Sequence, residues 1–254
     1  MQFEIDFRPL TIDEGRALIR FARCVIEQCL KFGDCTVDEC IDSVKPYEGK
    51  FRSLKLPVFV TIEKIMTSEG GVTKRVIRGS MGIPVPRLDM LNGVLLAAKH
   101  AAFRDPRRSC LQASEWHNCV IEITILSEPS VVTLEEFYRK FIIGYHAISL
   151  RVDRDLIVIL PQMQIDVLEK ILFSERRKLS KISLREYVYK LFESFNIPQH
   201  VERIAIHSTQ IFYELFPEGQ VIERKPYLNR YIKYIEREET VKREVSEEKS
   251  VLKT

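Results

Sequence analysis

Apolar residues recur every three or four positions over residues 11–31 and predict a long amphipathic helix at the start of the chain. Thr11 and Glu14 have the spacing of a capping box, in which two side chains bond the first free N–H groups of a helix. Gly33 follows as a stop signal. The charged residues of this segment are expected to face solvent: Arg16, Arg20, Arg23 and Glu27.

Runs of β-branched and aromatic residues predict short strands, most of them in hairpins. The expected strands are 57–65, 74–78, 118–126, 147–152, 155–160 and 207–215, with a turn at 68–71. The expected further helices are 89–103, a short one from Thr133, 164–173, 183–195, 198–204 and a last helical stripe over 227–235. The polar segment 34–55 predicts mostly loop, with a short helix left open, and strict alternation over 118–126 predicts a half-buried strand. This irregular order predicts an α+β fold with antiparallel sheets.

Charge is nearly balanced along the chain, with 39 basic and 36 acidic residues among 254 and a net charge of +3. A nucleic-acid-binding domain usually has a large excess of basic residues, so this balance argues against that class for the chain as a whole. The segment 72–108 differs, because eight of its residues are Lys or Arg and two are Asp. Two interpretations stay open for it, a solvated face and a patch for an anionic partner such as RNA.

No apolar run approaches the roughly 20 residues that a membrane-spanning helix needs, and the acidic first residues are unlike a signal peptide. The sequence therefore predicts a cytoplasmic protein with no membrane partner. Its six cysteines are then expected to be reduced thiols.

Four of the six cysteines lie close together near the N-terminus: Cys24, Cys29, Cys35 and Cys40. Their spacing is wider than that of zinc sites, so we expect no metal and favour buried thiols. Abundant Ile, Lys, Arg and Glu with little Asn is typical of hyperthermophile proteins, in which intracellular disulfides occur. A bridge such as Cys35–Cys40 therefore stays open, as does the redox state of Cys110 and Cys119.

The stretch Val76-Ile77-Arg78-Gly79-Ser80-Met81-Gly82-Ile83 is the most specific motif of the chain. It resembles the core motif Leu-Arg-Gly-Cys-Ile-Gly of the AMMECR family, named for the Alport syndrome, midface hypoplasia and elliptocytosis chromosomal region. Further stretches agree with the family in the same order: 18–23, 59–62, 105–107, 123–129 and 159–163. The resemblance covers residues 11–226.

The resemblance implies a two-lobed α+β fold, with one lobe inserted between two segments of the other and the Arg-Gly motif at a cleft. We expect one lobe from 11–56 and 145–226, the other from 57–144, and a helical, charged, partly frayed tail over 227–254. The resemblance also implies partners, because members are often encoded beside, or fused to, Memo-type and radical SAM proteins. A catalytic role has been supposed for the cysteine of the motif.

Position 80 is Ser where the family pattern has Cys. A serine hydroxyl neither ligates an iron–sulfur cluster nor forms a disulfide, so thiol and metal chemistry are excluded at this position. Ser80 stays a weak candidate for a catalytic nucleophile, because a hydroxyl needs a base. His146 is the best placed of four histidines for that task, the others being His100, His117 and His207.

Gly79 and Gly82 are expected to let the chain turn after a strand, so that backbone N–H groups and Arg78 can hold an anion. The structural alternative is a bulge or close packing, with Arg78 paired to a buried carboxylate such as Asp105. Asp105 could also orient Arg78 toward a ligand. Arg107 is either a ligand contact or a solvated residue, and Gln162, after a buried strand, is suited to ligand recognition or to capping a loop.

These residues together form the candidate ligand-binding set: Arg78, Gly79, Ser80, Gly82, Asp105, Arg107 and Gln162. The sequence favours a binding or partner module for an anionic small molecule, a nucleotide or an RNA segment, with no cofactor. The alternative is an enzyme or accessory factor in a modification reaction with the Memo-type and radical SAM partners. The ligand, the reaction and the oligomeric state stay open.

Overall fold

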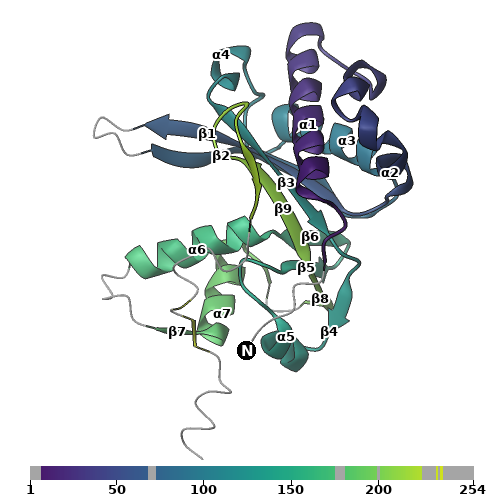
Figure 1. Cartoon of the computed structure of the whole chain (residues 1–254). Coiled ribbons are helices and arrows are strands. Elements are labelled where there is room, and N and C mark those ends of the chain that lie inside the picture. The colour runs from purple at the N-terminus through teal and green to yellow at the C-terminus, as the bar shows by residue number, and fades with distance from the viewer. Residues whose placement is uncertain are drawn as a thin grey trace, which may run out of the picture. The chain divides into compact units, whose positions relative to one another are not determined.

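Two units make up the chain, which is analysed as a computed structural model (Figure 1). The structure describes residues 7–67, 73–174, 181–198, 201–224, 233 and 235–236. Unit 1 comprises Met1–Glu128 and Ser208–Lys225, and unit 2 comprises Pro129–His207 and Pro226–Thr254.

The core of unit 1 is an antiparallel five-stranded sheet in the order β10-β9-β3-β1-β2. Its strands are β1 Val58–Thr67, β2 Thr73–Ile83, β3 Cys119–Leu126, β9 Thr209–Glu214 and β10 Val221–Glu223. β3 lies in the middle, and all its residues are buried. The prediction of a half-buried strand there was wrong, because the polar residues that alternate along β3, such as Glu122 and Thr124, are buried as well.

Helices pack on the sheet of unit 1, with α1 and α3 on the same side of it (Figure 1). The helical segments are α1 Ile12–Phe32, η1 Asp38–Ser43, η2 Lys45–Tyr47, α2 Glu48–Ser53, α3 Met90–Phe103 and α4 Ala113–Trp116. α1 begins at the predicted capping box of Thr11 and Glu14 and ends at Gly33, which has a left-handed conformation. The segment 34–55, predicted as mostly loop, therefore contains several short helical turns.

Arg23 of α1 corrects the predicted solvent face of that helix. Its side chain is buried, and its Nη2 lies 2.6 Å from Oε2 of Glu214 on β9. The guanidinium also lies 4.5 Å from the ring centre of the buried Trp116. Helical spacing indicates on which face of α1 Arg23 lies. It does not show that this face is covered by Glu214, which is 191 residues away in the sequence.

Unit 2 has its own sheet and its own core. The antiparallel sheet has the order β4-β8-β5-β6, and a short parallel pair joins β7 to β11. The strands are β4 Ser130–Val132, β5 Ala147–Val152, β6 Asp155–Ile159, β7 Ile182–Ser183, β8 Arg203–His207 and β11 Ile235–Glu236. The helices are α5 Leu134–Lys140, α6 Pro161–Ser174 and α7 Leu184–Ser194. Phe137, Leu168 and Tyr187 are fully buried in this core.

Helices and antiparallel sheets confirm the predicted α+β class. The expected strand 207–215 is in fact two strands, β8 and β9, which separate at Ser208 and join different sheets. The expected helix 198–204 is wrong where it is described, since Arg203 and Ile204 begin β8. The turn 68–71, most of the stripe 227–235 and the tail from 237 lie outside the described residues, and Ile235 is in β11.

The residue ranges of the two units differ from those expected for the two lobes. Residues 11–56 and 57–126 belong to the same unit, because α1 packs on α3 and on strands β3, β9 and β10. Among the described residues, no helix is both long enough and apolar enough to cross a membrane.

Candidate functional site

The motif residues 78–82 lie inside strand β2 and not in a turn after it. β2 pairs with β1, and the register shifts once, between the pairs Ile62–Gly79 and Glu63–Ile77. Arg78 is therefore the extra residue of a β-bulge, a feature that redirects a side chain at a sheet edge. The predicted turn was wrong, and the structural alternative of a bulge is what the strand contains.

Gly79 and Gly82 serve close packing, since the glycines with positive φ in the described chain are Gly33 and Gly144. A Cβ on Gly79 would lie 2.0 Å from the carbonyl oxygen of Ala101 in α3. A Cβ on Gly82 would lie 2.2 Å from the ring of Phe59. The motif thus lets a helix carbonyl and an aromatic ring approach the strand backbone.

Arg78 bonds to the segment that follows α3. Its Nε and Nη2 donate to Oε1 of Glu115 over 2.9 and 2.6 Å. Its Nη1 donates to the Ser109 carbonyl and its Nη2 to the Cys110 carbonyl. The bond from Arg78 holds the pKa of Glu115 at about 2. Arg78 does pair with a carboxylate, but the partner is the half-buried Glu115 and not Asp105.

Asp105 and Arg107 hold the backbone of Ser80 at the free edge of β2. The Ser80 N–H donates to Oδ2 of Asp105 over 2.9 Å, and Nη2 of Arg107 donates to the Ser80 carbonyl over 2.7 Å. Arg107 Nε and Nη2 also donate to the Asp105 carboxylate, each over 2.8 Å. Burial alone would raise the pKa of Asp105, but these bonds lower it to about 2. The Arg107 side chain is 55% exposed and the Asp105 side chain 2%.

The hydroxyl of Ser80 lies 2.8 Å from Oγ1 of Thr61, its cross-strand neighbour. A second hydroxyl cannot act as a base at neutral pH. His146, the expected base, lies in unit 2, where its Nδ1 accepts a bond from the Ile142 N–H. The Thr61 hydroxyl therefore does not supply the base that Ser80 would need to act as a nucleophile.

A row of polar side chains crosses the sheet from the motif, and none of the sequence patterns indicated it. The register places Ser80 beside Thr61, and Thr61 beside Glu122. Glu122 is 1% exposed, and its Oε2 accepts a 2.6 Å bond from Nη2 of Arg224. Burial and the charge of Glu122 raise the pKa of Glu63. Alternation on β3 indicates which side Glu122 occupies, but it does not show that this side is buried.

The structure brings six of the seven candidate residues together in unit 1. The seventh, Gln162, lies in unit 2, in the first turn of α6 rather than in a loop after a strand. Gln164, two residues further on, makes a bond of the kind considered for Gln162: its Oε1 accepts from the Gly144 N–H over 3.1 Å. Gln164 also donates from Nε2 to the His146 carbonyl over 2.7 Å. Glu115 was missed too, although its spacing from Gln112 is that of a capping box.

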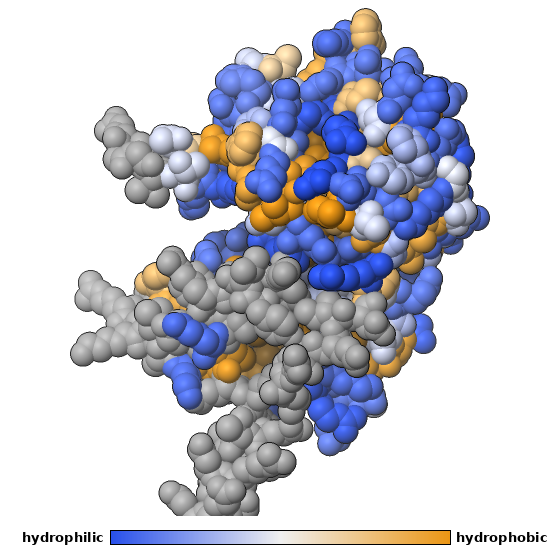
Figure 2. Space-filling model, in the orientation of Figure 1, coloured by the Kyte–Doolittle hydropathy of each residue, from blue (hydrophilic) through white to orange (hydrophobic). Residues whose placement is uncertain are grey.

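The basic segment 72–108 divides into paired and exposed residues. Its ion pairs are Arg75 with Glu63, Arg78 with Glu115, Lys99 with Asp34 and Arg107 with Asp105. Its other basic residues are exposed: Lys74, Arg87, Arg104 and Arg108. Figure 2 shows mostly hydrophilic side chains on the visible surface of unit 1, with a smaller apolar area among them. Since half of the basic residues of this segment are in ion pairs with the protein's own carboxylates, the segment does not form one continuous cationic patch.

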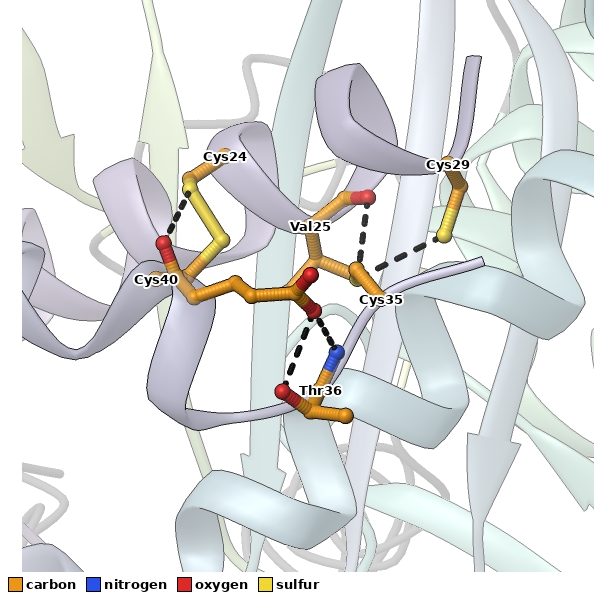
Figure 3. The surroundings of a disulfide bond; sticks show 7 residues. Cys24, Val25, Cys29, Cys35, Thr36 and Cys40 are labelled. Atoms are coloured by element: carbon orange, nitrogen blue, oxygen red, sulfur yellow. Dashed lines mark hydrogen bonds between the residues drawn. A yellow bond between two sulfur atoms is a disulfide. The ribbon is translucent and has the colours of Figure 1, made fainter. Parts of the chain in front are cut away.

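The N-terminal cysteines contain a disulfide that joins Cys24 of α1 to Cys40 of η1 (Figure 3). The expectation of buried thiols is therefore wrong for Cys24 and Cys40, whereas Cys29 and Cys35 are free and buried. The bridge that the sequence left open joins Cys24 to Cys40 and not Cys35 to Cys40. Cys35 does not pair with Cys40, because its sulfur points back to α1, toward the Val25 carbonyl and Cys29. No group of three or more His, Cys, Asp or Glu residues in the described chain has an arrangement that holds a metal.

The fold is similar to that of a solved structure, the uncharacterized protein PH0010 from Pyrococcus horikoshii. The TM-score is 0.63 at 22% identity, and the match covers 85% of this chain and 99% of that one. This match places the chain in a class of α+β proteins that share the fold.

The family follows from the sequence comparison. The AMMECR1 family model matches residues 19–191, and the chain belongs to this family. Protein MJ0810 of Methanocaldococcus jannaschii is 26% identical over 226 residues, covering 86% of this chain and 98% of that protein. Protein PAE0745 of Pyrobaculum aerophilum is 28% identical over 225 residues, covering 86% and 94%. The family predicted from the motif is confirmed.

Proposed function

We propose that this chain is a binding module for a small phosphate- or carboxylate-bearing ligand, and that Arg107 makes the first contact. One observation carries the proposal. Asp105 fixes the Arg107 guanidinium through Nε and Nη2, while 55% of the side chain is exposed. A guanidinium whose orientation is already fixed loses little conformational entropy when it binds an anion.

The surroundings of Arg107 support this choice of residue. Arg78 donates from all three of its side-chain nitrogens to oxygens of the protein, so it supports the loop. The side-chain bonds of Arg107 within the described chain use its Nε and Nη2, so its Nη1 is available for an anion. The exposed Arg104 and Arg108 flank Arg107 in sequence and add positive charge. Binding is favoured over catalysis, because the neighbour of the Ser80 hydroxyl is another hydroxyl.

Calorimetric titration of the full chain with inorganic phosphate, ATP and a short oligouridylate tests the proposal. Loss of a charge-assisted bond typically costs about 1.5–3 kcal/mol, so Arg107→Gln should weaken binding roughly tenfold to hundredfold. Arg107→Lys keeps the charge but loses the paired donors, and an intermediate loss is expected. If the oligouridylate binds best and its affinity falls steeply with salt, the ligand is an RNA segment.

Arg52 provides the matched control. It is also exposed and paired with a carboxylate, with Nε 2.7 Å from Oε1 of Glu48, but it lies on α2, outside the motif. Arg52→Gln should leave binding unchanged. The proposal fails if no probe binds the wild-type chain saturably, or if Arg107→Gln binds as tightly as the wild type while its circular dichroism is unchanged.

A further inference from the structure

The cysteines at the end of α1 form two nested pairs around the turn at Gly33. The outer pair, Cys24 and Cys40, is a disulfide. The inner pair, Cys29 and Cys35, has two free, buried thiols whose sulfur atoms lie 3.5 Å apart (Figure 3). Both pairs connect α1 to the segment that returns along it, so the inner pair repeats the connection that the outer pair makes.

Several bonds fix Cys35 in this position. Its sulfur donates to the Val25 carbonyl of α1 over 3.4 Å, one helical turn before Cys29. Its own carbonyl accepts a bond from Nζ of Lys99 on α3. The next residue, Thr36, donates from its N–H and its hydroxyl to Oε2 of Glu39 (Figure 3). The return segment is therefore held against α1 independently of the outer disulfide.

We propose that Cys29 and Cys35 are a second disulfide site, which closes when the chain folds in the presence of a low-molecular-weight disulfide. A disulfide bond is about 2.05 Å long, so the two sulfur atoms need to approach by roughly 1.5 Å. In the reaction the two thiols lose two electrons and two protons and form the S–S bond. The small disulfide accepts them and is cleaved into two thiols.

Burial determines when this reaction takes place. It raises the pKa of Cys35 to about 12 and also raises that of Cys29, so the folded chain contains little thiolate at neutral pH. Since the thiolate is the species that attacks a disulfide, oxidation of the folded protein should be slow. Refolding of the reduced, denatured chain exposes both thiols and should close both pairs.

Peptide mapping after refolding with reduced and oxidised glutathione tests the site. The Cys110→Ser variant removes the exposed thiol and serves as the background. Remaining thiols are alkylated in denaturant before digestion. Cleavage after Glu27, Lys31 and Glu39 places each of the four cysteines in a separate peptide, so the two nested bridges can be told apart from crossed ones.

The expected products are the peptide pair containing Cys29 and Cys35 and the pair containing Cys24 and Cys40. Alkylated Cys29 and Cys35 beside an intact outer bridge would overturn the proposal, as would any other pairing. Cys29→Ser gives a second readout, because it removes the inner bridge and keeps the outer one. The oxidised parent should melt roughly 5–10 °C above the oxidised Cys29→Ser chain, and this gap should narrow when both are reduced.

Discussion

At the scale of single residues, the motif shows how a short, specific sequence can serve packing. Gly79 is buried under the carbonyl of Ala101, and Arg78 bonds to Glu115 and two carbonyls. Both residue types are required for geometric reasons. A side chain on Gly79 would collide with helix backbone, and a shorter cation at position 78 could not reach several acceptors at once.

Gly79→Ala tests the packing role. The added Cβ would lie 2.0 Å from a backbone oxygen that cannot rotate away, so we expect a loss of about 3 kcal/mol or more in the free energy of unfolding. Gly49→Ala in α2 is the matched control, because nothing lies within 4 Å of its added Cβ and alanine favours a helix by about 0.5–1 kcal/mol. Equal urea midpoints for the two variants would contradict this explanation of Gly79.

Residue types were easier to predict than residue partners. One alternative drawn from the sequence paired Arg78 with a buried carboxylate and gave Asp105 as the example. The partner is Glu115, 37 residues away, because the β-bulge turns Arg78 toward the segment after α3. Pairings of this kind depend on chain direction in space, which no local pattern records.

At the scale of elements, the segment after α3 protects the free edge of β2. An unpaired strand edge presents N–H and carbonyl groups to other chains and needs cover. Asp105 accepts from the Ser80 N–H, and Arg107 donates to the Ser80 carbonyl, as a neighbouring strand would. The same contact that closes the edge also fixes Arg107, so edge protection and the proposed anion site depend on one carboxylate.

Asp105→Asn should therefore lower the free energy of unfolding by about 2 kcal/mol at about pH 7, as measured by urea denaturation. The folded-state pKa of Asp105 is about 2, against 3.8 for an unperturbed carboxyl, so its stabilisation is present above pH 3.8 and is lost as the pH falls toward 2. The difference in free energy of unfolding between the wild type and Asp105→Asn should therefore shrink between pH 3.8 and about pH 2.

Asp13→Asn is the control. The Asp13 side chain is 62% exposed, so this change should cost under about 1 kcal/mol. If the difference between the wild type and Asp105→Asn does not change with pH, the negative charge of Asp105 is not what stabilises the fold.

Elements with local end signals were predictable. The helices α1 and α5 begin at capping boxes, Thr11 with Glu14 and Thr133 with Glu136, and both are present. The expected strand 207–215 failed because no residue type marks Ser208 as the point where the chain passes from one sheet to another. Propensity shows that residues are extended, but it does not show with which strand they pair.

At the scale of the whole molecule, the arrangement depends on pairings between distant segments. β9 joins the sheet of unit 1 beside β3, so residues 209–214 complete a core that begins with α1. The class α+β follows from the kinds of elements and was predictable. The strand order and the unit bounds do not follow, because many orders satisfy the same hydrophobic pattern.

The two units have separate buried clusters, and this separation should be visible in unfolding. Trp116 is the chain's single tryptophan and lies in the core of unit 1, so its fluorescence reports that unit, whereas circular dichroism reports both. Leu18 and Leu168 are each 0% exposed, in unit 1 and unit 2. Replacing either with Ala should cost about 2–5 kcal/mol. In guanidinium titrations, Leu18→Ala should lower the fluorescence midpoint, and Leu168→Ala should lower a dichroism transition while leaving fluorescence in place. Equal fluorescence shifts in both variants would show instead that the two cores unfold as one cooperative structure.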